Sequence, residues 1–317
     1  MPEPVLVHIG YHRTGSSWLQ KWVFAKPETG FRWTGKAKDD DPVRRLITRR
    51  WSEFEPEKLR RRFDHRFEEI RAYGLIPVVS FERLSGHACS GGFDSGEIAS
   101  RIRQVLPEAR VLIVVREQRS AIYSNYQRYI RAGGPGSLRQ FVCPPTTSNL
   151  RVPLFDFRHF EYHHLIRRYQ KLFGADSVLV LAFEQLQQDP RAFVAEIGRF
   201  MHRPLPEKIL DGLPYHVREQ ESLAPSEQLV LRRLNRFVRS EVNPVPLVDL
   251  DRHHALKRLV RPSDSAVAKL FPDALGERSE ASLRRELAEL VGDRYAESNR
   301  RSAELTGLDL AGSGYAV

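Results

Sequence analysis

The chain has few cysteines and no long apolar run. Its two cysteines, Cys89 and Cys143, cannot build a disulfide framework and lie at no metal-ligand spacing, so we expect a reducing compartment and no metal site. No apolar run approaches the roughly 20 residues of a membrane span. The first residues, Met1–Pro4, lack the basic flank of a signal peptide. These absences predict a cytoplasmic protein without a membrane span.

Acidic residues are the minority among the charged ones. Lys and Arg number 50 against 40 for Asp and Glu, which gives a net charge of +10. Such an excess attracts anionic ligands, namely nucleic acid, a phosphorylated cofactor or an acidic glycan. The densest basic run, Arg60–Arg62, is interpreted as a solvated helix face, and no nucleic-acid recognition module is visible. We therefore expect no nucleic-acid partner and keep a non-catalytic nucleic-acid binder only as an alternative.

Short apolar runs alternate with amphipathic segments along most of the chain. Strands are predicted at residues 5–9, 76–80, 111–115 and 178–181, and helices at 16–26, 43–51, 98–106, 119–130, 157–173, 190–200, 226–239 and 280–300. This alternation favours an α/β fold in which helices cover both faces of a parallel sheet. We predict one such domain over residues 1–245 and a helical C-terminal extension of it over residues 246–317.

The first predicted strand leads into a loop of glycine and hydroxyl residues, Gly10-Tyr11-His12-Arg13-Thr14-Gly15-Ser16-Ser17. A helix start presents unpaired N–H groups and a positive dipole end, so the loop predicts a phosphate site. Gly10 and Gly15 have the Walker glycine spacing, but Ser16 replaces its lysine, and Arg116 follows the third predicted strand where a magnesium-binding carboxylate would be needed. Phosphate binding is favoured, and a P-loop kinase is the alternative.

Two segments resemble the sulfotransferases that use 3′-phosphoadenylyl sulfate (PAPS). Their 5′-phosphosulfate loop, Pro-Lys-[Thr/Ser]-Gly-Thr-Thr-x-Leu, is similar to His12–Leu19, with changes at His12 and Arg13. Their second cofactor motif, an apolar strand ending in Arg with a Ser eight residues later, is matched by Arg116 and Ser124. The resemblance extends over nearly the whole chain, points to the bacterial, carbohydrate-type branch, and implies a three-layer fold like that of P-loop NTPases.

The resemblance implies a role for each residue of the first motif. The backbone N–H groups of Thr14, Gly15, Ser16 and Ser17, together with the two serine hydroxyls, would hold the 5′-phosphate of PAPS. Trp18 would stack on the adenine, and the alternative is that it is a core-facing helix residue.

The 3′-phosphate distinguishes PAPS from ordinary adenylates. The resemblance implies that Arg116 binds this phosphate through its guanidinium, and that Ser124 donates a hydrogen bond to it from its hydroxyl. Arg218 is a further candidate for this phosphate, and an ordinary surface charge is the alternative.

The reaction needs a cation and a base. Sulfonate transfer leaves negative charge on the bridging oxygen, which Arg13 would stabilise; a guanidinium stays protonated, unlike the lysine usual in the family. Glu82, in a Ser-x-Glu that resembles carbohydrate-type enzymes, is the favoured base for the acceptor proton. The alternatives are that Glu82 merely pairs with Arg83 or another surface arginine, and that His87 is the base. His12 is expected beside the reacting sulfonate.

The sequence therefore predicts a sulfotransferase that moves sulfonate from PAPS to a hydroxyl or amine of an acceptor, a glycan or a small molecule. The product of the cofactor is 3′-phosphoadenosine 5′-phosphate (PAP), and no metal is required. The sequence identifies neither the acceptor nor the oligomeric state.

Overall fold

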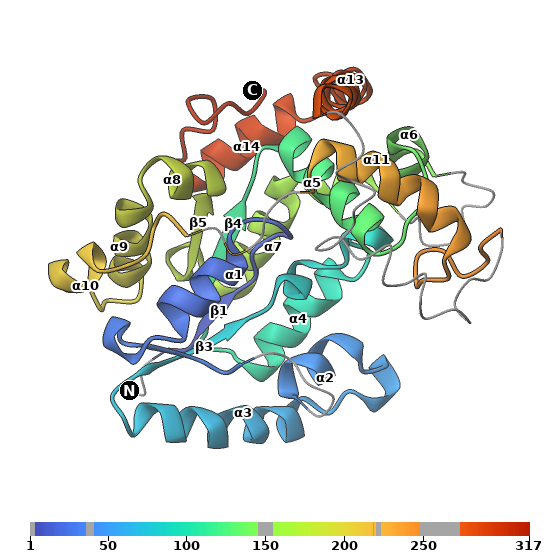
Figure 1. The fold of residues 1–317 in the computed structure, drawn as a ribbon. Helices are drawn as coiled ribbons and strands as arrows, with labels where there is room; N and C mark the ends of the chain where they lie inside the picture. The colour runs from blue at the N-terminus through green and yellow to red at the C-terminus, as the bar shows by residue number, and fades with distance from the viewer. Residues whose placement is uncertain (1–3, 36–40, 145–154, 218, 220–222, 248–272) are drawn as a thin grey trace. The chain divides into compact units, whose positions relative to one another are not determined.

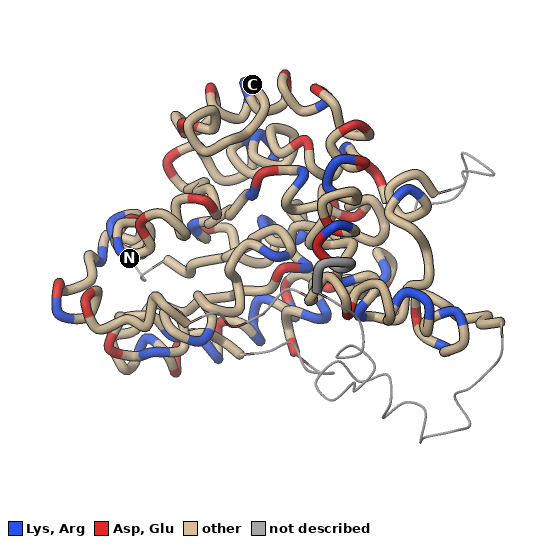
Figure 2. The backbone as a smooth tube through the Cα atoms, turned by 45° about the horizontal axis from the view of Figure 1, so that its top comes forward, with Lys and Arg blue, Asp and Glu red and all other residues tan. Residues whose placement is uncertain are grey.

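The structure, a computed structural model, describes residues 4–35, 41–144, 155–217, 219, 223–247 and 273–317. The chain divides into two compact units. The first comprises Met1–Gln118, Phe157–Gln220 and Tyr295–Val317, and the second comprises Arg119–Asp156 and Glu221–Arg294. Along both units basic residues are interspersed with acidic ones in the chain (Figure 2).

The first unit contains a five-stranded sheet in the order β2-β3-β1-β4-β5, in which every neighbouring pair is parallel. The strands are β1 (Leu6–His8), β2 (Phe31–Trp33), β3 (Ile76–Ser80), β4 (Arg110–Val115) and β5 (Val178–Ala182). The parallel sheet with helices on both faces confirms the predicted α/β fold (Figure 1). Four of the strands were predicted, and β2 is additional.

Helices cover each face of this sheet. On one face, side chains of α1 (Ser16–Trp18), the π-helix η1 (Leu19–Phe24) and α9 (Pro190–Phe200) form a single buried cluster with Leu6, Val78, Leu112 and Leu181 of the strands. On the other face, α3 (Pro56–Arg71) contacts β3, and α7 (Tyr162–Phe173) contacts β4 and β5. Alternate residues of each strand therefore point into the apolar layers on the two faces of the sheet. This explains why the strands are continuous apolar runs in the sequence.

The remaining elements of the first unit are short or peripheral. They are η2 (Pro27–Thr29), α2 (Pro42–Thr48), η3 (Trp51–Glu53), η4 (Glu82–Ser85), η5 (Ala88–Ser90), α4 (Ser95–Val105), η6 (Phe157–Phe160), η7 (Ala175–Ser177), α8 (Phe183–Gln188), α10 (Glu207–Asp211) and α14 (Ala296–Thr306). The helix predicted at 157–173 is divided into η6 and α7, with Glu161 between them. α14 packs on α7, so this part of the C-terminal region belongs to the α/β unit.

The second unit is helical in its described part. It contains α5 (Gln118–Arg131), which begins at the last residue of the first unit, then α6 (Leu138–Val142), α11 (Pro225–Leu234), η8 (Asn235–Phe237) and α13 (Asp273–Val291). α13 packs against α11 and α6. The helix predicted at 280–300 is in fact α13 and α14, which are separated at Gly292, a residue with a φ of 56°. None of the described helices is long and apolar enough to cross a membrane.

The sheet register makes the ends of β1 and β3 level, with β4 extending beyond them. His8 at the end of β1 is level with Ser80 of β3 on one side and Leu112 of β4 on the other. From β1 the chain leads to one side of the sheet, and from β4 it leads to β5 on the other. In open α/β sheets, ligands bind outside the carboxyl ends of strands at such a reversal. The fold therefore positions a site where the loops after β1 and β4 meet.

Candidate functional site

The loop after β1 has a strained and tightly bonded backbone. Arg13 has a φ of 70° and Gly15 a φ of 80°, so both lie in the left-handed region. For a residue with a side chain this conformation costs about 1–2 kcal/mol, and it persists where surrounding contacts impose it. The Thr14 hydroxyl donates to the Tyr11 carbonyl at 2.6 Å. The Thr14 side chain therefore shapes the loop, and its backbone N–H is the group that remains as a candidate phosphate donor.

Polar atoms converge on Gly10 within this loop. A Cβ added at Gly10 would lie 2.6 Å from His8 Nε2, 3.0 Å from Thr14 Oγ1 and 3.1 Å from Ser16 Oγ. His8 Nε2 and Ser16 Oγ are buried and have no hydrogen-bond partner within the described residues. Buried polar atoms without partners are rare in native proteins. The space beside Gly10 that is lined by His8, Thr14 and Ser16, here called the cradle, therefore fits a ligand that offers oxygen acceptors. The residues present thus suit the 5′-phosphate that the sequence predicts.

His8 is a site neighbour that sequence reasoning missed. Its Nδ1 lies 2.7 Å from Ser80 Oγ, which also accepts a hydrogen bond from Gln20 Nε2 at 3.0 Å. Burial lowers the pKa of His8 to about 3, so the ring is neutral at ordinary pH. A histidine at the end of an apolar strand was the signal that could have identified it. These contacts of His8, Ser80 and Gln20 link β1, β3 and η1.

Trp18, in the helix that follows the loop, is buried. It is 7% exposed, belongs to the apolar cluster of the sheet and donates from Nε1 to the Pro214 carbonyl at 3.3 Å. Its ring stacks on Tyr215, with centroids 5.7 Å apart and planes 24° apart. This agrees with the alternative stated from the sequence, that Trp18 is a core-facing helix residue. Adenine stacking on Trp18 stays a prediction, and a base bound there would meet Tyr215.

Arg116 joins the second motif to the loop. It follows β4, and its Nη1 donates to the Arg13 carbonyl at 3.0 Å. Its guanidinium lies over the Phe183 ring at 4.8 Å. Burial lowers the pKa of Arg116, and the nearby Glu184 carboxylate acts in the opposite direction. Its Nε has no hydrogen-bond partner in the part of the chain that the structure describes. Arg116 is therefore a half-buried cation with donor capacity beside the loop.

Four other predicted cofactor residues lie in different parts of the chain. His12 is buried, 6% exposed, while Ser17 is half-buried at the start of the loop helix. Ser124 is 5% exposed on α5 in the second unit, so its share in a 3′-phosphate site stays a prediction. Arg218 lies outside the described residues.

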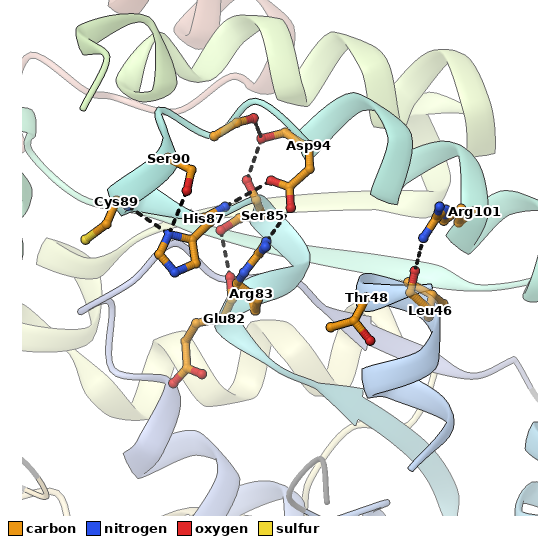
Figure 3. Close-up of polar contacts among 12 residues, drawn as sticks. Leu46, Thr48, Glu82, Arg83, Ser85, His87, Cys89, Ser90, Asp94 and Arg101 are labelled. Atoms are coloured by element: carbon orange, nitrogen blue, oxygen red, sulfur yellow. Dashed lines mark hydrogen bonds and ion pairs between the residues drawn. The ribbon is translucent and has the colours of Figure 1, made fainter. Parts of the chain in front are cut away.

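Glu82 follows β3, whose end is level with that of β1. Arg83 pairs with Asp94 at 2.6 Å and not with Glu82. Within the described residues the Glu82 carboxylate forms no ion pair, and it points away from Arg83 and Asp94 (Figure 3). The alternative that Glu82 is a partner of Arg83 is therefore wrong. Its half-buried carboxylate stays a candidate base near the ends of β1 and β3.

His87, the competing base, is the N-terminal cap of η5. Its Nδ1 accepts the Cys89 backbone N–H at 3.1 Å, and its own N–H donates to Asp94 Oδ1 at 3.1 Å (Figure 3). Because Nδ1 is the acceptor, a neutral His87 carries its proton on Nε2. That nitrogen can donate a hydrogen bond but cannot accept a proton from an acceptor hydroxyl. Glu82 and His87 both stay predictions for the base, and in this tautomer His87 Nε2 is a hydrogen-bond donor.

Metal ligands do not gather in the described part of the chain. Among residues 4–35, 41–144, 155–217, 219, 223–247 and 273–317, no group of three or more His, Cys, Asp or Glu side chains could hold a metal ion.

The family described as Sulfotransferase domain matches residues 3–222. Among solved structures, the chain is similar to a sulfotransferase from Alicyclobacillus acidocaldarius, at 17% identity and a TM-score of 0.49, over 80% of this chain and 99% of that one. It is also similar to mouse sulfotransferase SULT7A1 complexed with PAP, at 13% identity and a TM-score of 0.37, over 91% and 86% of the two chains. No curated protein sequence matches the chain.

Proposed function

Because the chain belongs to the sulfotransferase domain family, we propose that it transfers a sulfonate group from PAPS to a hydroxyl or amine of a carbohydrate or small-molecule acceptor. The observation that carries this proposal is the hydrogen bond from Arg116 to the Arg13 carbonyl, 3.0 Å long. It joins the loop, where Ser16 Oγ is buried and without a hydrogen-bond partner among the described residues, to the half-buried guanidinium that follows the neighbouring strand β4. Two anion-binding features so close together suit a nucleotide with two separate phosphate positions.

The chain's own groups supply the binding. The loop N–H groups from Thr14 to Ser17 and the Ser16 hydroxyl would hold the 5′-phosphate, since Ser16 Oγ has no partner in the described structure. Arg116 would hold the 3′-phosphate through its remaining donors, because a guanidinium matches phosphate geometry. PAPS, when bound, supplies the sulfonate and leaves negative charge on the bridging oxygen. Arg13 would stabilise that charge, since Arg116 bonds its carbonyl and the hydrogen bond from Thr14 to the Tyr11 carbonyl spans the loop on either side of it.

Glu82 would take the acceptor proton. A carboxylate without an ion-pair partner in the described chain keeps its lone pairs available, whereas Nδ1 of His87 is used by the Cys89 N–H. The family relationship leaves the acceptor open, and a carboxylate base suits a sugar hydroxyl or an amine. The same site would then bind, orient and deprotonate the acceptor next to the loop.

The test is transfer of labelled sulfonate from PAPS to a panel of sugar, amine and phenol acceptors. We expect labelled product with at least one hydroxyl or amine acceptor. Glu82→Gln should lower turnover by about 100-fold or more, the usual contribution of a positioned base, while PAP binding is retained. Glu108→Gln is the matched control, because Glu108 is exposed at the amino end of β4. Undiminished turnover by Glu82→Gln would place the base elsewhere.

A further inference from the structure

Glu184 lies at the start of α8 and has both carboxylate oxygens engaged. Oε1 accepts the Glu117 backbone N–H at 3.0 Å, and Oε2 accepts the Tyr315 hydroxyl at 2.9 Å. All three residues belong to the first unit. The carboxylate therefore connects the residue after Arg116 with a tyrosine close to the last residue of the chain.

The segment Arg116–Gln118 is held from several elements. The Tyr162 hydroxyl donates to the Arg116 carbonyl at 2.6 Å. Gln118 Nε2 donates to Asn299 Oδ1 at 2.6 Å, and Asn299 Nδ2 donates to the Ala316 carbonyl at 2.7 Å. Residues of α14 and the segment after it thus fix the backbone that carries Arg116.

The Tyr315 hydroxyl is suited to donate a hydrogen bond to Glu184 at any ordinary pH. It is 4% exposed, and its backbone N–H donates to the Leu310 carbonyl at 3.0 Å. Burial, followed by the charge of Glu184, raises the pKa of Tyr315 far above its ordinary value, so the hydroxyl keeps its proton. A protonated hydroxyl next to a carboxylate donates a charge-assisted hydrogen bond, which is stronger than a neutral one.

Glu184 is close enough to Arg116 to influence its charge but does not bind it. The Glu184 carboxylate opposes the burial-driven lowering of the Arg116 pKa, yet no ion pair joins the two within the described residues. Both carboxylate oxygens are instead directed to Glu117 and Tyr315. Without the Tyr315 hydroxyl, Oε2 of the half-buried Glu184 would lose its hydrogen-bond donor, and a carboxylate partly shielded from water is stabilised by a nearby cation. Arg116 is a cation placed beside it, because its guanidinium lies 4.8 Å from the ring of Phe183, the residue before Glu184, and Glu184 bonds the N–H of the residue after Arg116.

We propose that Tyr315 is a positioning residue that, through Glu184, keeps Arg116 available for the 3′-phosphate of the nucleotide. Loss of the Tyr315 hydroxyl releases a carboxylate that competes with the 3′-phosphate for the guanidinium. Selectivity for a 3′-phosphorylated nucleotide then depends on a residue remote in sequence. This inference rests on the proposed function, in which Arg116 binds that phosphate.

The experiment measures the ratio of PAP affinity to AMP affinity by calorimetry for the full chain, Tyr315→Phe and Tyr295→Phe. Tyr295 is the matched control, because it is also buried and its hydroxyl donates at 3.0 Å to the Phe157 carbonyl and not to Glu184. We expect the ratio to fall roughly threefold to tenfold in Tyr315→Phe, the range for loss of one hydrogen bond. It should not change in Tyr295→Phe, although both variants lose stability.

A double variant distinguishes competition of Glu184 for Arg116 from a general loss of order around Arg116. Adding Glu184→Gln to Tyr315→Phe removes the competing charge while keeping an oxygen for the Glu117 N–H, so the ratio should recover. A ratio that stays low in the double variant, or that equals the parent value in Tyr315→Phe, overturns the role of Tyr315. A ratio near one in the parent chain instead overturns the 3′-phosphate assignment itself, whatever the variants do.

Discussion

The buried His8 predicts a specific loss of stability in acid, which the variant His8→Asn should abolish. Asparagine places an amide where Nδ1 faces Ser80, so it can keep a hydrogen bond at the 2.7 Å contact. It has no group that titrates. The comparison therefore removes the ionisable ring while leaving a partner for Ser80.

The magnitude follows from the difference in pKa between the two states. Burial lowers the pKa of His8 to about 3, whereas a histidine in the unfolded chain has 6.5. Between pH 6.5 and about 3, His8 is protonated in the unfolded state and neutral in the folded state. The free energy of unfolding therefore decreases as the pH falls through this range. The loss is about 2 kcal/mol at pH 5 and about 5 kcal/mol in total, at 1.36 kcal/mol per pKa unit.

The assay is urea unfolding followed by tryptophan fluorescence at pH 7.5 and pH 5. All four tryptophans, Trp18, Trp22, Trp33 and Trp51, lie in the first unit with His8, so the signal reports on that unit. Other ionisable groups titrate equally in both proteins, so the difference between the two pH-dependent losses isolates His8. We expect the parent to lose about 2 kcal/mol more than His8→Asn. Equal losses would show that His8 titrates normally in the folded protein and would refute the burial argument.

Two further predictions concern the loop and the base. Gly10→Ala should lower PAP affinity roughly tenfold or more, because its Cβ would lie 2.6 Å from His8 Nε2 and overpack the cradle; Gly96→Ala, with open space at its Cβ, is the calorimetric control, and equal affinities in the two would contradict the cradle. His87→Asn should keep turnover within about twofold, since an amide oxygen can still cap the Cys89 N–H held at 3.1 Å; a loss comparable to that of Glu82→Gln would reassign the base.

The sequence predicts the central strands well because these are buried on both faces. β3, β4 and β5 are continuous apolar runs, and their bounds match the prediction within one residue. β2 was missed because only Phe31 of its three residues is buried, so it carries no run and no alternation. The predicted helix at 157–173 was too long, since Glu161 separates η6 from α7. Local patterns identify elements and do not mark such breaks.

The site was predictable where its residues lie next to strand ends. The loop and Arg116 each follow an apolar run, and the parallel register then brings them together. The residues that support them come from distant positions. Gln20 and Ser80 are 60 residues apart, and Tyr315 and Glu184 are 131 apart. Sequence spacing carries no signal for such pairs, because tertiary packing alone places them in contact.

The proposed site takes a nucleotide with phosphates at both the 5′ and 3′ positions. Calorimetric titration of the parent chain and of Arg116→Ala with PAP and with AMP tests it most directly. The parent should bind PAP at least roughly tenfold more tightly than AMP, and Arg116→Ala should remove most of that difference, because a hydrogen-bonded charge contributes about 1.5–3 kcal/mol. Equal affinities of the parent chain for PAP and AMP would contradict the claim.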